Sequence, residues 1–310
     1  MRKAKMGWRN GLLKVAPFMA LGVLTAGCAV TRLQTAEEGV VVERAFLNRS
    51  PFGMDWTEVF LFRPAGKGPF PGVVLLHGDQ PEPAGPPGGK EFFYDGTGEF
   101  LASKGYAVMA PSMPGFGDST GERDFVGPET LLRLQSAITH FQRLPYVDSR
   151  RIALFGASRG ATAAALLAPR IPGVFGLILQ SGLYDLREVA KGGGKGTSPK
   201  GTLPKAAREM RDRIGREAGA FPPEMARRSP AALSGGLSCP ILLIHGTEDQ
   251  TVSIEQMRRF AEALKRRMGK KCGVVTREVK AGHVLSGAVV WSEALPFLRG
   301  LLDASDWAKR

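Results

Sequence analysis

The stretch from Ile152 to Gly160 limits the fold of this chain more than any other. Four apolar residues lead directly into Gly156-Ala157-Ser158-Arg159-Gly160, and an alanine-rich run follows at 161–168. This order predicts a strand, a very tight turn and a helix, the context in which Gly-x-Ser-x-Gly forms a nucleophile elbow. Glycines are needed at both ends of the motif because side chains there would collide where the strand and the helix cross. We therefore expect the Ser158 hydroxyl to stand above the edge of a sheet.

The rest of the chain alternates strand-like apolar runs with helix-like periods. Its 310 residues are enough for one large α/β domain. The run before His77 is continuously apolar, as in a strand buried on both faces. We predict a mostly parallel sheet with helices on both faces, opened by an antiparallel pair. The expected strands are 36–44, 56–63, 71–78, 106–110, 152–155, 174–180, 241–245 and 273–279, and the expected helices are 96–104, 128–144, 161–168, 254–268 and 286–302.

The N-terminus has the pattern of an export signal. Five lysines and arginines in the first 14 residues precede an uncharged, mostly apolar run at 15–27 that is short for a bilayer span. Leu24-Thr25-Ala26-Gly27-Cys28 resembles the bacterial lipobox, which implies cleavage before Cys28 and a lipid anchor on that cysteine. An ordinary cleaved signal and an uncleaved anchor are the alternatives. In each case we expect an exported protein, in the periplasm or at the outer membrane if the cell is Gram-negative.

Two cysteines follow Cys28 in the chain. Cys239 and Cys272 each precede an apolar run, and in an oxidising compartment they could form a disulfide. Two buried free thiols are the alternative. Histidines and cysteines are not clustered at metal-ligand spacing, so we expect no metal site.

An activated serine needs a base, and the chain has four histidines. If the three residues follow the chain order serine, acid, histidine, as in other proteins with such an elbow, His77 and His140 are excluded because they precede Ser158. His245 ends an apolar run, where we expect a structural role under the loop that carries the acid. His283 follows the last expected strand, on a loop that can reach over the serine. We therefore take His283 as the candidate base.

The acid is expected on the loop that follows the strand 241–245, which comes directly before the strand that leads to His283. Asp249 lies there, and its neighbour Glu248 is a competitor. Asp185, which follows the expected strand 174–180, is a second alternative. We favour Asp249.

An oxyanion requires two backbone N–H groups aimed at it. One is expected from Arg159, directly after the nucleophile, and the other from Asp79 or Gln80, after His77-Gly78. An aspartate beside a developing negative charge is unexpected, so only the backbone of Asp79 would be useful there.

As an ordered set, these motifs resemble the α/β-hydrolase superfamily, in the branch of the prolyl-oligopeptidase catalytic domain and dienelactone hydrolase. Dienelactone hydrolase proper uses a cysteine where this chain has Ser158. Prolyl oligopeptidases carry a large N-terminal propeller domain, for which this chain has no room. The resemblance implies an eight-stranded-type sheet with a small cap insertion. It also implies a serine hydrolase but does not identify the substrate. Its pieces, between about 40 and 302, are Phe62-Arg63-Pro64-Ala65, Leu76-His77-Gly78, Pro114-Gly115-Phe116-Gly117-Asp118-Ser119, Gly156–Gly160, Ser229-Pro230, His245–Asp249 and Ala281-Gly282-His283.

The expected organisation is a signal peptide at 1–27, a linker at 28–38 and a hydrolase domain at 39–303, with a cap at about 183–236. Removing the five basic residues of the signal lowers the formal net charge from +13 to +8. From Arg187 to Arg228, eleven lysines and arginines stand against five acids. Such a basic cap could attract anionic lipid or acidic substrates, or could be a solvated surface. Nucleic acid is not expected, because no recognition motif is present.

The expected chemistry is cleavage of an ester, thioester or amide of a small molecule or lipid, without metal or organic cofactor. Ser158 would attack, His283 would take its proton, and Asp249 would orient the imidazole. An exopeptidase is one alternative, although the cap lacks the glutamate pair that usually holds the substrate amine. The others are an acyltransferase and a hydrolase-fold envelope lipoprotein that binds without catalysis. An intact serine, acid and histidine set argues against that last alternative.

Overall fold

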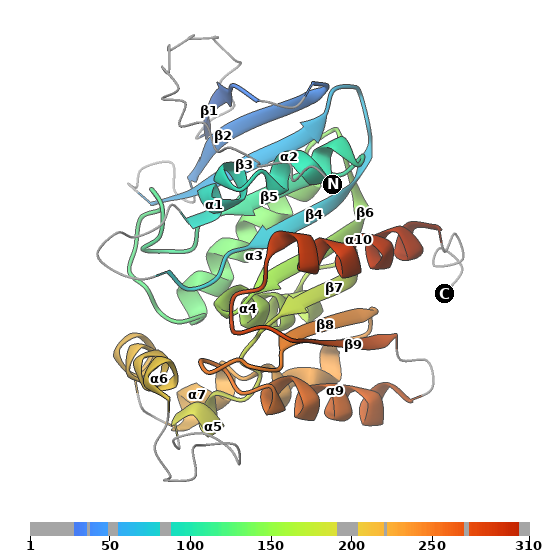
Figure 1. Ribbon diagram of the computed structural model, residues 1–310. Helices are drawn as coiled ribbons and strands as arrows, with labels where there is room; N and C mark the ends of the chain where they lie inside the picture. The colour runs from blue at the N-terminus through green and yellow to red at the C-terminus, as the bar shows by residue number, and fades with distance from the viewer. Residues whose placement is uncertain are drawn as a thin grey trace, which may run out of the picture.

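The protein is built around one mixed sheet, seen in the computed structural model of the chain (Figure 1). The structure describes residues 28–35, 38–48, 55–80, 88–190, 204–219, 222–269 and 273–303. Within these ranges the sheet has nine strands in the order β1-β2-β3-β5-β4-β6-β7-β8-β9. β1, β2, β3 and β5 pair antiparallel with one another along this order, and every later pair is parallel.

The elements have the following bounds. The strands are β1 Cys28–Leu33, β2 Val40–Asn48, β3 Trp56–Pro64, β4 Phe70–Leu76, β5 Ala107–Pro111, β6 Val147–Ala157, β7 Val174–Gln180, β8 Ile241–Gly246 and β9 Val274–Val279. The helices are α1 Glu91–Tyr94, α2 Thr97–Ser103, α3 Pro128–Gln142, α4 Arg159–Leu167, α5 Leu186–Ala190, α6 Lys205–Ala218, α7 Pro222–Arg227, α8 Pro230–Leu233, α9 Glu255–Met268 and α10 Gly287–Asp303, with 3-10 turns η1 Gly88–Lys90, η2 Ala168–Arg170 and η3 Ser234–Gly236.

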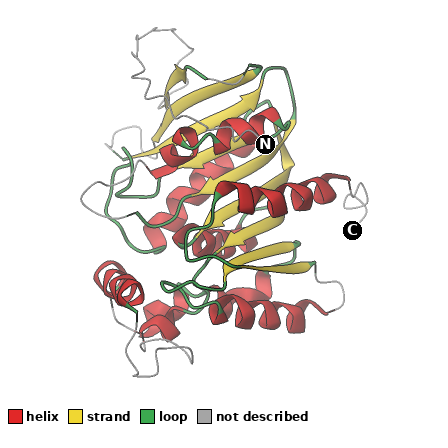
Figure 2. Ribbon diagram, viewed as in Figure 1, coloured by secondary structure: helices red, strands yellow, loops and turns green. Residues whose placement is uncertain are grey.

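Helices cover both faces of the sheet (Figure 2), as the sequence predicts. Successive residues of a strand point to opposite faces, so a strand covered on both sides must be apolar throughout. β4 shows this directly. Val74 and Leu76 pack in the cluster that includes residues of α3, α4 and α9, whereas Val73 and Leu75 pack in the cluster that includes residues of α2 and α10.

The first strands differ from the expectation. Residues 28–33, predicted as part of a linker, form the edge strand β1, which pairs with β2 from Cys28 opposite Leu47 to Leu33 opposite Val42. The strand predicted at 36–44 begins instead at Val40, after a turn in which Gly39 has a φ of 76°. β1 thereby covers the edge of β2, whose backbone groups would otherwise be unpaired. The sheet therefore has one strand more than the eight-stranded type.

The sheet has a topological switch point at its centre. β4 and β6 are neighbours, but β4 connects onward to β5 on one side and β6 to β7 on the other. In open α/β sheets, ligands bind outside the carboxyl ends of the strands at such a point. His77 directly follows β4 and Ser158 directly follows β6, so the fold brings the two loops together there.

The segment between β7 and β8 contains α5, α6, α7 and α8. α5, α6 and α7 lie together at the lower left of Figure 1. α6 buries Met210, Ile214 and Ala218 against the larger of the two core clusters. The predicted cap at about 183–236 holds these helices, and its role as a cap remains a prediction.

Candidate active site

The turn at Ser158 has the strained geometry of a nucleophile elbow. Ser158 lies between β6 and α4 with φ 50° and ψ −113°, and φ in this range is uncommon for a residue with a side chain. A Cβ atom at Gly156 would lie 2.2 Å from the Gly160 carbonyl oxygen, and one at Gly160 would lie 2.0 Å from the Leu76 carbonyl oxygen. The close crossing thus requires both glycines, as the motif predicts.

The structure brings Ser158, His283 and Asp249 into one hydrogen-bonded chain. His283 Nε2 lies 2.9 Å from Ser158 Oγ, and His283 Nδ1 lies 2.7 Å from Asp249 Oδ2. Asp249 comes from the loop after β8 and His283 from the loop between β9 and α10, as predicted. The order and distances are those of a nucleophile, a base and an orienting acid.

The Asp249 carboxylate is held by four donors. Oδ1 accepts the backbone N–H groups of Thr251 and Val252 at 2.8 and 2.9 Å. Oδ2 lies 2.7 Å from His283 Nδ1 and 3.0 Å from His245 Nε2. Burial alone would raise the pKa of Asp249, but the hydrogen bonds from His245 and His283 outweigh it and hold that pKa well below its usual range. An ionised Asp249 keeps the proton of His283 on Nδ1 and leaves Nε2 free to accept the serine proton.

The competing acids lie elsewhere. The Asp185 carboxylate binds Arg187, with Oδ1 2.9 Å from Nε and Oδ2 2.7 Å from Nη2. Glu248 is exposed, and its backbone N–H donates to the Ala281 carbonyl 2.9 Å away. Of the three candidate acids, Asp249 is the one that contacts His283.

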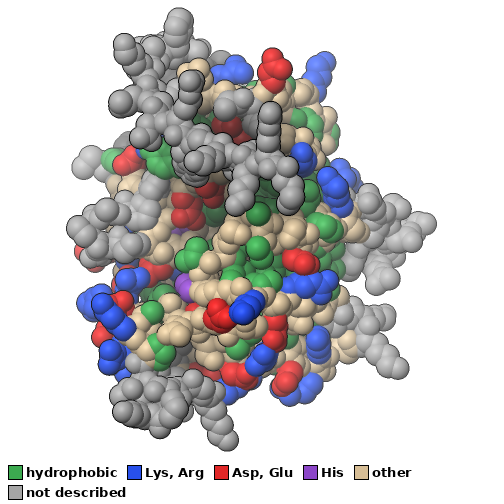
Figure 3. Space-filling model, viewed as in Figure 1, with side chains coloured by type: hydrophobic (Ala, Val, Ile, Leu, Met, Phe, Trp, Pro, Cys, Tyr) green, Lys and Arg blue, Asp and Glu red, His purple; other side chains and the backbone are tan. Residues whose placement is uncertain are grey.

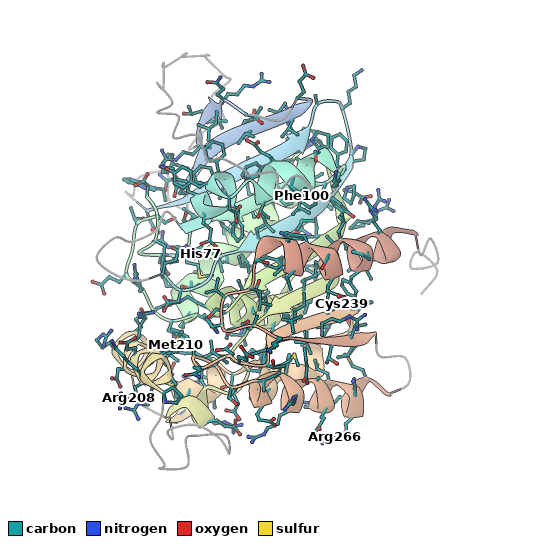
Figure 4. All side chains as sticks on the ribbon, viewed as in Figure 1. His77, Phe100, Arg208, Met210, Cys239 and Arg266 are labelled. Carbon is teal, nitrogen blue, oxygen red and sulfur yellow. The ribbon has the colours of Figure 1, made fainter. Side chains whose placement is uncertain are left out.

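His77 and His245 are structural, and each supports one of the site loops. His77 Nδ1 donates to the Gly78 carbonyl at 2.8 Å, and Nε2 accepts the Met113 N–H at 3.0 Å. Burial, assisted by the nearby positive Arg159, lowers the pKa of His77 to about 4, so the ring is neutral. Figure 4 labels His77 inside the molecule. His245 supports the loop that carries the acid, as expected, with its Nε2 3.0 Å from both Asp249 Oδ2 and the Val252 carbonyl oxygen.

Of the predicted oxyanion donors, Arg159 directly follows Ser158, and its side chain pairs with that of Asp79. Arg159 is the first residue of α4, so its N–H is among those that have no partner within the helix. The Asp79 carboxylate does not bear an uncompensated charge. Its Oδ1 lies 2.9 Å from Arg159 Nη2, and its Oδ2 contacts Arg213 of α6. Two guanidinium groups thus neutralise the aspartate that looked out of place beside an oxyanion.

Gln80, the other candidate donor, is fixed by a residue that the sequence did not single out. Its Nε2 donates to Glu91 Oε2 at 2.5 Å. Burial, with a smaller contribution from Asp95, raises the pKa of Glu91 to about 7. Glu91 therefore holds the loop 77–80 from α1. Nothing in its local sequence, Gly89-Lys90-Glu91-Phe92, distinguishes it from a surface glutamate.

Two of the cysteines, Cys28 and Cys239, lie in the described part of the chain. Cys28 is the first residue of β1 at the sheet edge. Cys239 is a buried free cysteine, and Cys272 lies outside the described residues, as does the expected signal peptide at 1–27. The pairing of Cys239 with Cys272 stays a prediction. Over the described part of the chain, no group of three or more His, Cys, Asp and Glu side chains is placed to hold a metal ion.

Comparisons with known proteins relate this site to hydrolases. The model of the prolyl oligopeptidase family matches residues 94–294. The chain is 30% identical over 172 residues to "Uncharacterized peptidase YtmA" of Bacillus subtilis, covering 53% of this chain and 60% of that one. It is 30% identical over 108 residues to "Esterase FrsA" of Klebsiella pneumoniae, covering 35% and 24%. The chain thus spans less than two thirds of the length of these relatives.

Solved structures with the same fold include an acetyl xylan esterase from Paenibacillus. It superposes with a TM-score of 0.63 at 16% identity, over 89% of each chain. At this identity the likeness concerns the fold alone.

Proposed function

This chain belongs to the prolyl oligopeptidase family, and on that premise we propose that it is an esterase whose nucleophile is Ser158. It is a serine hydrolase of the α/β-hydrolase type. The proposal rests above all on the contact chain from Ser158 Oγ through His283 to Asp249, at 2.9 and 2.7 Å.

The reaction follows from this contact chain. As Ser158 Oγ attacks the carbonyl carbon of an ester, its proton passes to His283 Nε2, and the positive imidazolium is stabilised by ionised Asp249. The same proton then goes to the leaving alcohol, which leaves an acyl group on Ser158. Water, activated by His283, releases the acid and restores the serine. The backbone N–H groups of Arg159 and of Asp79 or Gln80 would hold the oxyanion in both steps.

An ester is favoured over a peptide as substrate by two considerations. "Esterase FrsA" and the acetyl xylan esterase carry that activity in their names. The segment expected to form the cap also lacks the paired glutamates that would hold a free substrate amine. The relative named as a peptidase supports the alternative, an exopeptidase acting through the same three residues.

We also propose that the protein is an exported lipoprotein anchored through Cys28. The basic n-region, the apolar run and the lipobox-like sequence support this. No helix among the described ranges is long and apolar enough to cross a bilayer. Incorporation of radiolabelled palmitate by growing bacterial cells tests the anchor. We expect labelled wild-type protein and unlabelled Cys28→Ala protein, and equal labelling of the two would contradict the proposal.

Activity-based labelling tests the esterase. We expect the full chain, purified in detergent, to react with a fluorophosphonate and to hydrolyse short p-nitrophenyl esters faster than aminoacyl p-nitroanilides. Ser158→Ala and His283→Ala should abolish both signals, whereas His140→Gln, a change on α3, should not. A folded wild type that neither labels nor turns over would refute the enzyme in favour of a binding protein. Faster cleavage of the anilides would favour the exopeptidase.

A further inference from the structure

We propose that helix α6 positions the oxyanion hole, with Arg213 and Glu217 as positioning residues that act through Asp79 and Arg159. The inference rests on the proposed function, because it concerns the backbone donors of that reaction. Its starting point is a network of four charges between α6 and the two loops that flank Ser158.

The network is buried at its centre, where the charges of Arg159 and Asp79 are paired. The Arg159 side chain is 1% exposed and that of Asp79 3% exposed. Arg159 Nη2 lies 2.9 Å from Asp79 Oδ1, and Arg159 Nη1 lies 2.7 Å from Glu217 Oε2. Arg213 Nη1 contacts the second oxygen of Asp79. Two positive and two negative groups thus join α6 to residue 79 on one side and to residue 159 on the other.

Aromatic rings enclose the Arg159 guanidinium. Its Cζ lies 4.5 Å from the ring centre of Phe125 and 5.1 Å from that of Phe116. The backbone N–H of Phe125 donates to Glu217 Oε2 at 3.1 Å. Phe125 and Val126 both have positive φ, 41° and 60°, which surrounding contacts must maintain. Glu217 therefore holds Arg159 and this strained turn at the same time.

The same two residues lie where the backbone donors for the oxyanion are proposed. Arg159 contributes the N–H after the nucleophile, and Asp79 lies in the loop that contributes the second. Charges buried this deeply are strongly destabilised when they lose their partners. If α6 moved away, Asp79 would lose Arg213 and Arg159 would lose Glu217. Arg159 and Asp79 would then have only each other as ion-pair partners, so docking of α6 helps to hold both loops in place.

One face of α6 packs against the protein and carries these contacts, and the opposite face is exposed to solvent. Met210 is buried on the inner side, whereas Arg208 projects from the other side (Figure 4). Arg216 is exposed and has no acidic partner among the described residues. Arg208 and Arg216 are thus matched controls on the same helix, since each carries the charge of Arg213 without its contact.

Steady-state kinetics of ester hydrolysis by the full chain tests the role of Arg213. Arg213→Gln should lower kcat by about 10- to 100-fold, less than the roughly 10²- to 10³-fold effect of deleting a whole oxyanion donor. KM should change by less than about threefold, because the oxyanion exists only in the transition state. Arg213→Lys should recover most of the activity, because an ammonium can still pair with Asp79. Arg208→Gln and Arg216→Gln should stay within about twofold of the wild type.

A double-mutant cycle identifies the path of the effect. If Arg213 acts through Asp79, then Arg213→Gln should add less than about twofold to the loss already caused by Asp79→Asn. Glu217→Gln keeps the size of the side chain but not its charge, and it tests the network independently of Arg213. It should lower kcat in the same way even if Arg213→Gln does not fold.

The proposal is overturned if folded Arg213→Gln and Glu217→Gln proteins keep kcat within twofold of the controls, or if their loss appears only in KM. The proposal is also contradicted if the losses in kcat caused by Arg213→Gln and Asp79→Asn multiply fully in the double variant. The wild type separates this failure from that of the proposed function. A wild type that hydrolyses esters only with Ser158 in place sustains the esterase, whatever the network variants do.

Discussion

Replacement of Asp249 by asparagine is the most direct test of the assignment of the acid. The introduced side chain would keep an oxygen for the backbone N–H groups of Thr251 and Val252, which lie 2.8 and 2.9 Å away. Its NH₂ group would then face the imidazoles of His283 and His245 in place of Oδ2. Because a donor would face a donor, His283 must turn its lone pair to the amide and carry its proton on Nε2. That nitrogen then cannot accept the serine proton.

The expected losses follow from these contacts. The wrong imidazole tautomer lowers kcat by about 10⁴-fold where the same substitution disables a Ser-His-Asp triad. His283 is partly exposed, at 18%, and can turn towards water, whereas the His245 side chain is 0% exposed and cannot. Hydrogen bonds to charged groups contribute about 1.5–3 kcal/mol each. Because His245 Nε2 also lies 3.0 Å from the Val252 carbonyl oxygen, it would keep one acceptor, and we expect a stability loss at the lower end of this range, about 1.5 kcal/mol.

The stability loss should also depend on pH in a defined direction. The pKa of Asp249 lies well below its unperturbed value of 3.8. Its ionisation therefore stabilises the fold fully above that value, and the stabilisation fades as pH falls through the acid range. Urea unfolding should show a difference between the wild type and Asp249→Asn that is constant from about pH 5 to 8 and shrinks below about pH 4.

Initial rates with a p-nitrophenyl ester, beside circular dichroism to establish folding, provide the assay. Asp185→Asn and Glu248→Gln are the matched controls, and we expect both to remain within about threefold of the wild type because neither side chain contacts His283. If folded Asp249→Asn protein retains more than about a tenth of the activity, the assignment of Asp249 as the acid is wrong. A loss of activity in Asp185→Asn instead would transfer that role to Asp185.

Three further substitutions, one of them a control on α6, test the elbow and the loop that Glu91 supports. Gly160→Ala should destabilise the fold by about 3 kcal/mol or more, because the new Cβ would lie 2.0 Å from the Leu76 carbonyl. Gly215→Ala, with nothing within 4 Å, should instead stabilise α6 by about 0.5–1 kcal/mol, and equal melting temperatures of the two variants would contradict this reading. Since burial raises the pKa of Glu91 from 4.5 to about 7, the wild type should lose about 3 kcal/mol of stability as pH rises from about 4.5 through 7. This slope should be absent in Glu91→Gln, and a slope that persists there would assign it to another group.

The sequence was most informative where one short motif predicted both a backbone turn and a candidate catalytic residue. The glycines at 156 and 160 predicted the turn, and that turn made Ser158 the reference for the other site residues. Chain order and strand position then sufficed to select His283 and Asp249, because parallel strands place their following loops at one edge of the sheet. The continuous apolar character of β4 likewise predicted a sheet covered on both faces.

Contacts between side chains far apart in the sequence were beyond such reasoning. Glu91 supports Gln80, but nothing in the sequence around a lone glutamate indicates its partner. The strand β1 was missed for a related reason. Its six residues include Arg32 and Thr31 and show no marked alternation, and they are ordered by pairing with β2 rather than by their own propensity.

The structure changes the interpretation of the basic charge in the segment predicted as a cap. Counted along the sequence, its basic residues suggested a positive field over the substrate. In the structure, Arg213 is instead paired with Asp79, in a network whose four charges cancel. Arg208 and Arg216 point to solvent, and basic side chains gather over this part of the surface at the lower left of Figure 3. Because the inner charges are neutralised and the outer ones face solvent, the basic face of α6 is better suited to an anionic surface, such as the membrane of a lipid-anchored protein, than to an acidic substrate.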